Sequence, residues 1–267
     1  MEKIAAHNIT DTGQWRLTAD ISETSVRAWL RRNDEPEAPM FILADATLDS
    51  DNSLSAIEDA VYDNSSMLDD FEADIILSTP RFTLLPAELA DDAGLCRKAF
   101  SIVFGETAAE DIMTDTAAGY TVVYSPVAGL NSFLSRTFAG SRIWCHISVL
   151  LNYWQPLAPG GPAMFADIRR GYIDMALFQD GRLLSASRHY WNDTDDAVYH
   201  LLSACRAAGT EIPQLALFLS GPRDLTATVG DTVSDYIAGV QNIAIPHDAE
   251  VPAADAICSY RNNRRQS

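Results

Sequence analysis

The pattern of apolar and polar positions along the chain predicts two similar series of strands and helices. The first series has β-favouring runs over 14–21, 24–31 and 40–44, helical spacing over 53–71 with a break near 64–66, and a buried strand over 73–78. The second has strands over 163–168, 172–179 and 182–189, a helix over 195–208 and a strand over 215–219. Three consecutive strands in each series indicate an antiparallel meander.

Each series continues with a further helix and strand. In the first half, Ser125-Pro126 starts a helix that ends near Gly140, a strand covers 142–147, and 148–155 forms a linking helix. In the second half, Gly221-Pro222 opens a helix that Gly239 closes, and 242–245 is the last strand. Both halves therefore read βββαβαβ, which predicts an α/β fold with a duplicated unit.

A repeated run aligns the two halves. The stretches 17–30 and 164–177 are each an apolar strand ending in Ala-Asp-Ile, a short turn and a second strand, as expected after a gene duplication. Asp20 and Asp167 are 147 positions apart, whereas Pro126 and Pro222 are only 96 apart, so the first half contains 51 extra residues. They lie within 79–124, where a strand over 81–85, a helix over 86–104 and a hairpin turning at 117–119 predict a small inserted subdomain.

We therefore expect a first half over 1–157 with its insert at about 79–124, a second half over 158–247, and a C-terminal tail over 248–267. The length of 267 residues and the apolar fraction of 47% are typical of a packed globular protein.

The charge balance excludes some partners. The formal net charge is -18, and the acidic residues are spread along the chain, so the protein should repel nucleic acid and anionic membrane surfaces. The one basic cluster, Arg261, Arg264 and Arg265, is interpreted as a solvated tail. No apolar run is long enough to insert into a membrane, and the N-terminus lacks the apolar core of a signal peptide, which predicts a cytoplasmic protein. Four widely spaced cysteines are expected to be reduced, mostly buried thiols.

The duplicated unit, with an aspartate at the end of the first strand of each half, resembles the superfamily of actin, sugar kinases and heat-shock ATPases. This resemblance implies an actin-like ATPase fold built from two ribonuclease-H-like halves. Three further runs, 79–89 (TPRFTLLPAEL), 148–152 (SVLLN) and 178–184 (FQDGRLL), resemble an uncharacterised bacterial family that is assigned the actin-like ATPase fold. The resemblance covers nearly the whole chain. It is more distant to the actin-like pilus-assembly and secretion proteins, and it carries no established activity.

The superfamily resemblance implies a specific chemistry. In it, two hairpin turns close around nucleotide phosphates, each with Asp followed two residues later by Gly, because a residue without Cβ lets backbone N–H groups approach closely. The aspartates organise Mg²⁺ through water. The matching positions here are Asp20 with Ser22, and Asp167 with Arg169, so both acids are present and both glycines are replaced.

The remaining positions implied by the resemblance are partly kept. Gly171 follows Arg169 by two residues, and Ser220-Gly221 stands where the superfamily has a Gly-Gly turn that holds adenosine. Arg169 could place a cation near phosphate, or its side chain could fill the phosphate pocket; we favour the second interpretation. The alternative for Asp20 and Asp167 is that each is a turn residue hydrogen-bonding local backbone.

Other motifs point to no chemistry. The five histidines share no metal-ligand spacing, and Cys145 and His146 fall on a predicted strand, where neighbouring side chains face opposite ways, which argues against a catalytic pair. No nucleophile elbow, Walker loop or dinucleotide fingerprint occurs. The aromatics of 189–191 and 151–154 belong either to the core or, if exposed, to an interface; we favour the core.

Three functions remain in competition. The leading hypothesis is a non-catalytic protein-interaction or scaffold module with a degenerate actin-like fold, without catalytic residues or cofactor, which binds a protein partner or self-associates. The alternative is an ATPase or small-molecule kinase that binds Mg-ATP, with Asp20 and Asp167 organising the metal. The third is a structural dimer that uses the insert over 79–124 as its contact.

Overall fold

The computed structural model describes residues 9, 11–35, 40–48, 53–243 and 257, which divide into two compact units. Unit 1 runs to Val149 and also contains Ile257, and unit 2 begins at Leu150. The predicted domain boundaries and the tail over 248–267 stay predictions, because apart from Ile257 the tail lies outside the described residues. Ile257 is fully buried.

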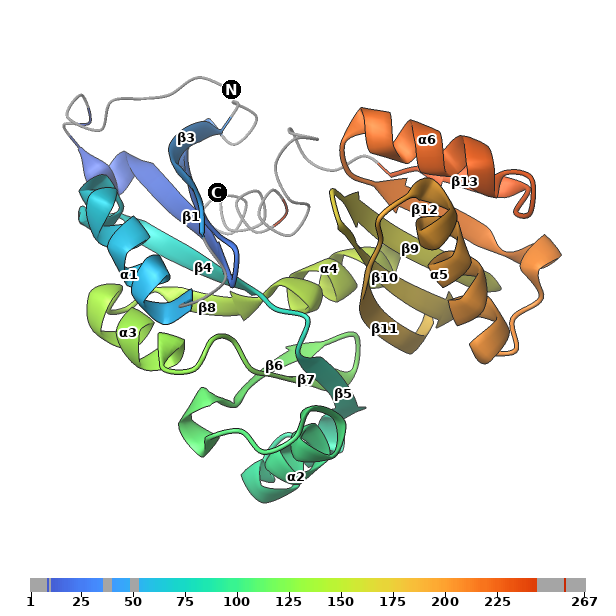
Figure 1. The fold of residues 1–267 in the computed structure, drawn as a ribbon, viewed down its shortest axis with the longest axis horizontal. Coiled ribbons are helices and arrows are strands. Elements are labelled where there is room, and N and C mark those ends of the chain that lie inside the picture. Colours follow the sequence, from blue (N-terminus) through green and yellow to red (C-terminus); the bar gives the residue numbers. More distant parts are fainter. Residues whose placement is uncertain (1–8, 10, 36–39, 49–52, 244–256, 258–267) are drawn as a thin grey trace. The chain divides into compact units, whose positions relative to one another are not determined.

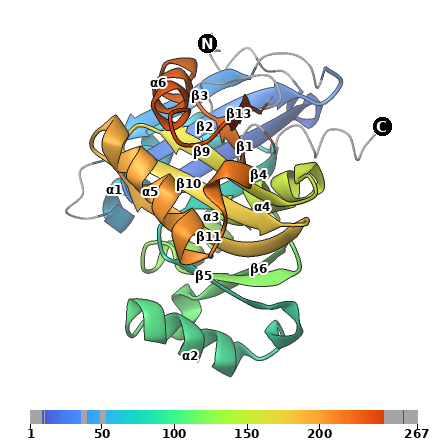
Figure 2. The same cartoon turned by 90° about the vertical axis from the view of Figure 1, so that its right-hand side faces the viewer.

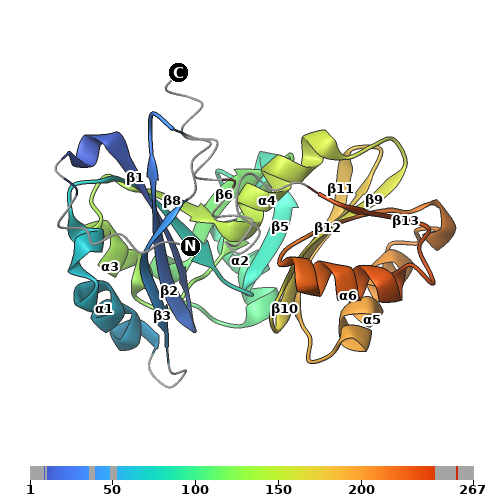
Figure 3. The same cartoon turned by 90° about the horizontal axis from the view of Figure 1, so that it is seen from above.

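Unit 1 is built on a five-stranded sheet with the order β3-β2-β1-β4-β8 (Figure 1). Its strands are β1 (Trp15–Ser22), β2 (Ser25–Arg32), β3 (Phe41–Thr47), β4 (Glu72–Ser78) and β8 (Arg142–Cys145). The first three are antiparallel, and β4 and β8 run parallel to β1. Helices α1 (Ser53–Asp63) and α3 (Leu130–Thr137) lie on one face of this sheet (Figure 3).

Unit 2 repeats this topology with the order β11-β10-β9-β12-β13. Its strands are β9 (Pro162–Arg169), β10 (Tyr172–Gln179), β11 (Arg182–Tyr190), β12 (Ala216–Ser220) and β13 (Gly239–Asn242). Helices α5 (Thr194–Ala207) and α6 (Arg223–Val233) lie side by side on one face (Figure 2). The α/β fold with two βββαβαβ series is therefore confirmed.

Both faces of the central strand of unit 2 are buried. On one face, Met164, Ala166 and Ile168 pack with apolar residues of α5 and α6. On the other, the Phe165 ring stacks between Trp154 and Phe218, with centroid distances of 5.8 and 4.7 Å. Burial on both faces explains why the second copy of the repeat reads as a continuous apolar run into which Asp167 is inserted.

The insert forms its own small sheet, with the order β5-β7-β6. It consists of β5 (Phe82–Pro86), α2 (Ala93–Phe104), β6 (Met113–Ala117) and β7 (Tyr120–Tyr124). The helix begins later than the predicted residue 86, because the Asp92 carboxylate caps it by accepting a hydrogen bond from the Leu95 N–H at 2.9 Å. A short 3₁₀ turn covers Ser65–Leu68, at the position where the sequence predicts a break in the first helix. Further 3₁₀ turns cover Thr12–Gln14, Ala87–Leu89, Ala109–Asp111, Gln155–Leu157 and Ile212–Gln214.

Further predicted boundaries are also wrong. The strand predicted over 142–147 ends at Cys145, and α4 (His146–Trp154) begins at the next residue. The helix predicted from Ser125-Pro126 begins only at Leu130, after Gly129 at its N-cap. Gly239 does not close a helix but begins β13, since α6 already ends at Val233; residues 244 and 245 of the predicted last strand lie outside the described residues.

Candidate functional site

The two repeated aspartates occupy equivalent places on the two central strands. Asp20 lies in β1 and Asp167 in β9, and both are almost fully buried, with 4% and 3% of the residue exposed. Each lies inside its strand, so the interpretation of both as turn residues is wrong. Asp20 belongs to unit 1 and Asp167 to unit 2.

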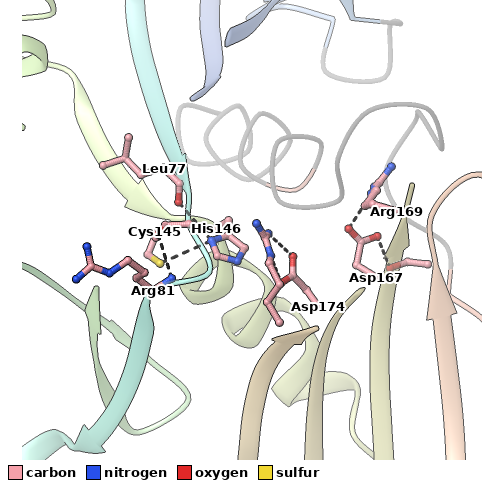
Figure 4. A network of polar contacts seen from close by, with 10 residues as sticks. Leu77, Arg81, Cys145, His146, Asp167, Arg169 and Asp174 are labelled. Carbon is pink, nitrogen blue, oxygen red and sulfur yellow. Dashed lines mark hydrogen bonds and ion pairs between the residues drawn. The ribbon is translucent and has the colours of Figure 1, made fainter. Parts of the chain in front are cut away.

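The carboxylate of Asp167 already holds a partner on each oxygen (Figure 4). Arg169 Nε donates to Oδ2 at 2.9 Å, and Ser220 Oγ donates to Oδ1 at 2.9 Å. Arg169 is two positions further along β9 and thus on the same face, while Ser220 stands beside Asp167 on the parallel strand β12. The Arg169 and Asp167 side chains are only 8% and 4% exposed, so this is a buried, charge-assisted pair.

A second buried ion pair lies beside the first, on residues that the sequence analysis did not single out. Asp174 of β10 is directly opposite Asp167, and Arg188 of β11 is directly opposite Asp174. Arg188 Nε and Nη2 donate to the two Asp174 oxygens at 2.7 and 2.6 Å. The available signal was an acid inside the apolar run of 173–178, since a buried carboxylate requires a partner.

Arg188 is held from a further side by an aromatic ring. Its guanidinium lies 4.1 Å from the centroid of Tyr172, which is on the same face of β10 as Asp174. The Trp191 indole N–H donates to the Arg169 carbonyl oxygen at 2.9 Å and thereby fastens the end of β9. Together these contacts fix both arginines within unit 2.

Asp167, Asp174 and Arg188 form a row of facing positions on β9, β10 and β11. The equivalent row in unit 1 carries different charges. Asp20 is opposite Arg27 of β2, and Arg27 is opposite Asp45 of β3. Arg27 Nε lies 3.2 Å from Asp45 Oδ1, in a pair whose side chains are 39% and 56% exposed. In the adjoining turn, the hydroxyls of Ser22 and Ser25 are 2.9 Å apart, so the side chain that replaces the glycine bonds within its own turn.

The two retained glycines have structural roles in unit 2. Gly171 has φ +83° and completes the two-residue turn between β9 and β10, with open space where a Cβ would stand. Gly221 has φ +128°, and a Cβ there would lie 2.2 Å from the Ile168 carbonyl oxygen. Only glycine fits this approach of the β12–α6 turn to β9.

The side chains of Cys145 and His146 do not point opposite ways as predicted. Because the strand ends at Cys145 and the helix begins at His146, strand alternation does not apply, and Sγ lies 3.9 Å from Nδ1. The same Nδ1 is 3.3 Å from the Leu77 carbonyl oxygen (Figure 4). Both residues are buried, at 0% and 2% exposure, which leaves the thiol inaccessible to a substrate.

Acidic and phenolic groups near this junction are also shielded from water. Burial raises the pKa of Asp115, whose carboxylate accepts a hydrogen bond from the Cys145 backbone N–H at 3.3 Å. Burial also raises the pKa of Tyr124, with smaller contributions from Cys145 and Asp115. Both groups belong to the insert, and both interact with Cys145 at the end of β8.

The aromatic runs divide between core and surface. Trp154 is fully buried, whereas Tyr190 is 63% exposed. Beside Tyr190, the rings of His189 on β11 and His200 on α5 stack with centroids 4.5 Å apart. Burial, and secondarily the neighbouring His200, lower the pKa of His189.

The described part of the chain contains no group of three or more histidine, cysteine or acidic side chains arranged to hold a metal ion. Its cysteines Cys96, Cys145 and Cys205 are free and buried. No helix in the same described ranges has both the length and the apolar character needed to cross a membrane.

The close approach at Gly221 generates a stability prediction. Gly221→Ala should lower the free energy of unfolding by at least about 2 kcal/mol, because Cβ would collide with the backbone of β9. Gly160→Ala is the matched control, since Gly160 has open space and no left-handed backbone, and it should change stability by less than about 0.5 kcal/mol. Urea unfolding measures both, and equal losses for the two variants would contradict the assignment.

Comparison with solved structures confirms the predicted fold. A protein from Bacteroides thetaiotaomicron with an actin-like ATPase fold and unknown function matches with a TM-score of 0.76 and 19% identity, over 90% of this chain and 95% of that one. Matches with lower TM-scores include the cytoplasmic domain of EpsL, from the type II secretion system of Vibrio cholerae (0.45, 12% identity, 95% of each chain). Another is the PilM–PilN type IV pilus biogenesis complex (0.49, 12% identity, 95% of this chain and 99% of that one).

A search of curated proteins gave no significant match. A family model described as protein of unknown function DUF3822 matches residues 6–240, which is most of the chain. The chain therefore belongs to the DUF3822 family of proteins of unknown function, and it has an actin-like ATPase fold.

Proposed function

We propose that this protein is a non-catalytic interaction or scaffold module, in which the nucleotide site of the actin-like fold has been replaced by internal ion pairs. The observation that carries the proposal is the environment of Asp167, whose two oxygens accept hydrogen bonds from Arg169 and Ser220. A carboxylate that organises Mg²⁺ through water needs free oxygens and no competing cation. The Arg169 guanidinium supplies the positive charge from within the chain.

The geometry around Asp167 does not suit a Mg-nucleotide bound as the resemblance implies. Arg169 stands where a glycine would let backbone N–H groups approach phosphate, and its side chain is committed to Asp167. Displacing the Arg169 side chain would leave its guanidinium and the buried Asp167 carboxylate without their counterions. Breaking a buried ion pair costs about 3 to 5 kcal/mol. Ser22 takes the equivalent position in unit 1, with its hydroxyl bonded to Ser25.

The surface supports the protein-interaction half of the proposal. Ile102 and Val103 are adjacent on α2 of the insert and are 77% and 59% exposed. Neighbouring apolar side chains that stay in water are favourable contacts for another protein. We also propose a cytoplasmic location, since three free, buried cysteines suit a reducing compartment.

Nucleotide binding is tested by thermal unfolding with and without Mg-ATP. A ligand that binds only the folded state at about a hundred times its Kd stabilises it by about 2.7 kcal/mol, which raises the melting temperature by several degrees. We expect no rise for this protein. A rise that depends on nucleotide concentration and disappears in Asp167→Asn would contradict the proposal and support the Mg-ATP-binding alternative, an ATPase or small-molecule kinase.

Self-association is tested by sedimentation velocity over a range of protein concentrations. We expect a concentration-dependent increase in mass that is lost in the double variant Ile102→Asp, Val103→Asp, because desolvating two carboxylates opposes an apolar contact. Leu157→Asp, at a 46% exposed residue outside the insert, is the control. A monomer at every concentration would exclude self-association through α2, and unchanged association in the double variant would place the contact elsewhere.

A further inference from the structure

The acid Asp174 creates an electrostatic problem for Asp167. The two residues are directly opposite each other on adjacent antiparallel strands, where Cβ atoms are about 4.5 to 5.5 Å apart. Both are buried, with 3% and 2% of the residue exposed. Two carboxylates at this separation and burial repel each other unless each has its own counterion.

Each carboxylate does have its own arginine, which is Arg169 on β9 for Asp167 and Arg188 on β11 for Asp174. Arg169 Nε contacts Asp167 Oδ2 at 2.9 Å, and Arg188 contacts both oxygens of Asp174 at 2.7 and 2.6 Å. The bidentate geometry uses two parallel N–H donors of Arg188 on one carboxylate, which is the strongest form of such a pair. The cluster of Asp167, Arg169, Asp174 and Arg188 therefore contains two negative and two positive charges.

We infer that Arg188 is a positioning residue for this site: by neutralising Asp174, it leaves Arg169 as the counterion of Asp167 alone. Without Arg188, the Arg169 guanidinium would be attracted by two neighbouring carboxylates at once. The inference deepens the proposed function and rests on its Arg169–Asp167 pair. It concerns how that pair is held, and its test involves no nucleotide.

The charged and titratable groups around Asp174 define what a test must control. Tyr172 is on the same strand, Asp167 and Arg169 are on β9, and Arg188 is on β11. Also on β11 are Tyr190, opposite Tyr172, and His189, which stacks on His200 of α5 at the other face of the sheet. Helix α4 packs on the same face of the sheet as Asp174, because its Trp154 ring stacks on Phe165. The residue before Trp154 in α4 is Tyr153, which is also titratable. Among these described groups, only Arg169 and Arg188 are permanently cationic.

Removing Arg188 should make stability depend on pH. In Arg188→Met the two buried carboxyl groups of Asp167 and Asp174 share one remaining counterion, Arg169. The folded state is therefore most stable when one of the two carboxyl groups is protonated. The unfolded chain releases that proton near pH 4, so the folded variant binds more protons than the unfolded one, and its stability falls as pH rises. A role of Arg188 in packing alone would lower stability equally at every pH.

The experiment measures urea unfolding from about pH 4.5 to about pH 7.5. At each pH, the folding equilibrium constant of Arg188→Met is divided by that of the unchanged protein. This ratio should be at least about tenfold lower at the upper pH than at the lower pH. Arg188→Met with Asp174→Asn should remove this extra pH dependence, because it removes both buried charges. Arg182→Met, at the exposed start of β11, is the matched control and should show none.

A spectroscopic readout follows Arg169 itself. The Arg169 Nε–H signal in a ¹⁵N NMR spectrum, assigned by its loss in Arg169→Met, should shift in Arg188→Met and return to its original position in the double variant with Asp174→Asn. A pH-independent loss of stability, or an Arg169 signal that stays unmoved in Arg188→Met, would overturn the inference. If Arg188→Met does not fold near neutral pH, folding of the double variant supports the inference and its failure to fold overturns it.

Discussion

A carboxylate buried at the centre of a β-sheet needs a counterion or hydrogen-bond donors, and for Asp167 the sheet itself provides them. Asp167 is on the central strand of unit 2, and an uncompensated ion at such a place would cost several kcal/mol. Arg169 and Ser220 supply its hydrogen bonds, and Arg188 does the same for the neighbouring Asp174. Strands β9, β10, β11 and β12 thus all contribute to one polar row, on the face opposite the apolar contact with α5 and α6.

The same place in unit 1 has a different charge pattern on the same strand order. There the row is acid, arginine and acid, formed by Asp20, Arg27 and Asp45, and its ion pair lies near the surface. Exposed pairs of this kind contribute little, about 0 to 1 kcal/mol. The two units therefore share their backbone plan, whereas the side chains that surround the repeated aspartate differ.

The succession of strands and helices in both halves could be predicted from the sequence because it depends on periodicity and on a repeat. The range 172–179 matches β10, and the run before Asp167 matches the central strand. The pair of Asp174 and Arg188 could not be predicted, because a contact across 14 residues depends on the register of β10 and β11, which shifts at a bulge between Leu177 and Phe178.

Other differences have equally local causes. Periodicity does not distinguish the last residue of β8 from the first of α4, so it predicts His146 on a strand and gives no sign of its contact with Cys145. Gly239 has the residue type expected after a helix, but it lies beside the Leu215 carbonyl oxygen, which would be 3.1 Å from a Cβ, and it starts a strand. The repeated Ala-Asp-Ile was sufficient to find Asp167, and the replacement of the following glycine by Arg169 was sufficient to question a phosphate site.

In the function that we propose, the Arg169 guanidinium takes the place of a bound cation at Asp167. The most direct test of this proposal is an anomalous difference map from crystals of the whole protein soaked with Mn²⁺ and a non-hydrolysable ATP analogue. We expect no manganese peak in the first or second coordination sphere of Asp167, and we expect Arg169 Nε to remain hydrogen-bonded to its carboxylate. A manganese peak there, with the Arg169 side chain displaced, would contradict the proposal.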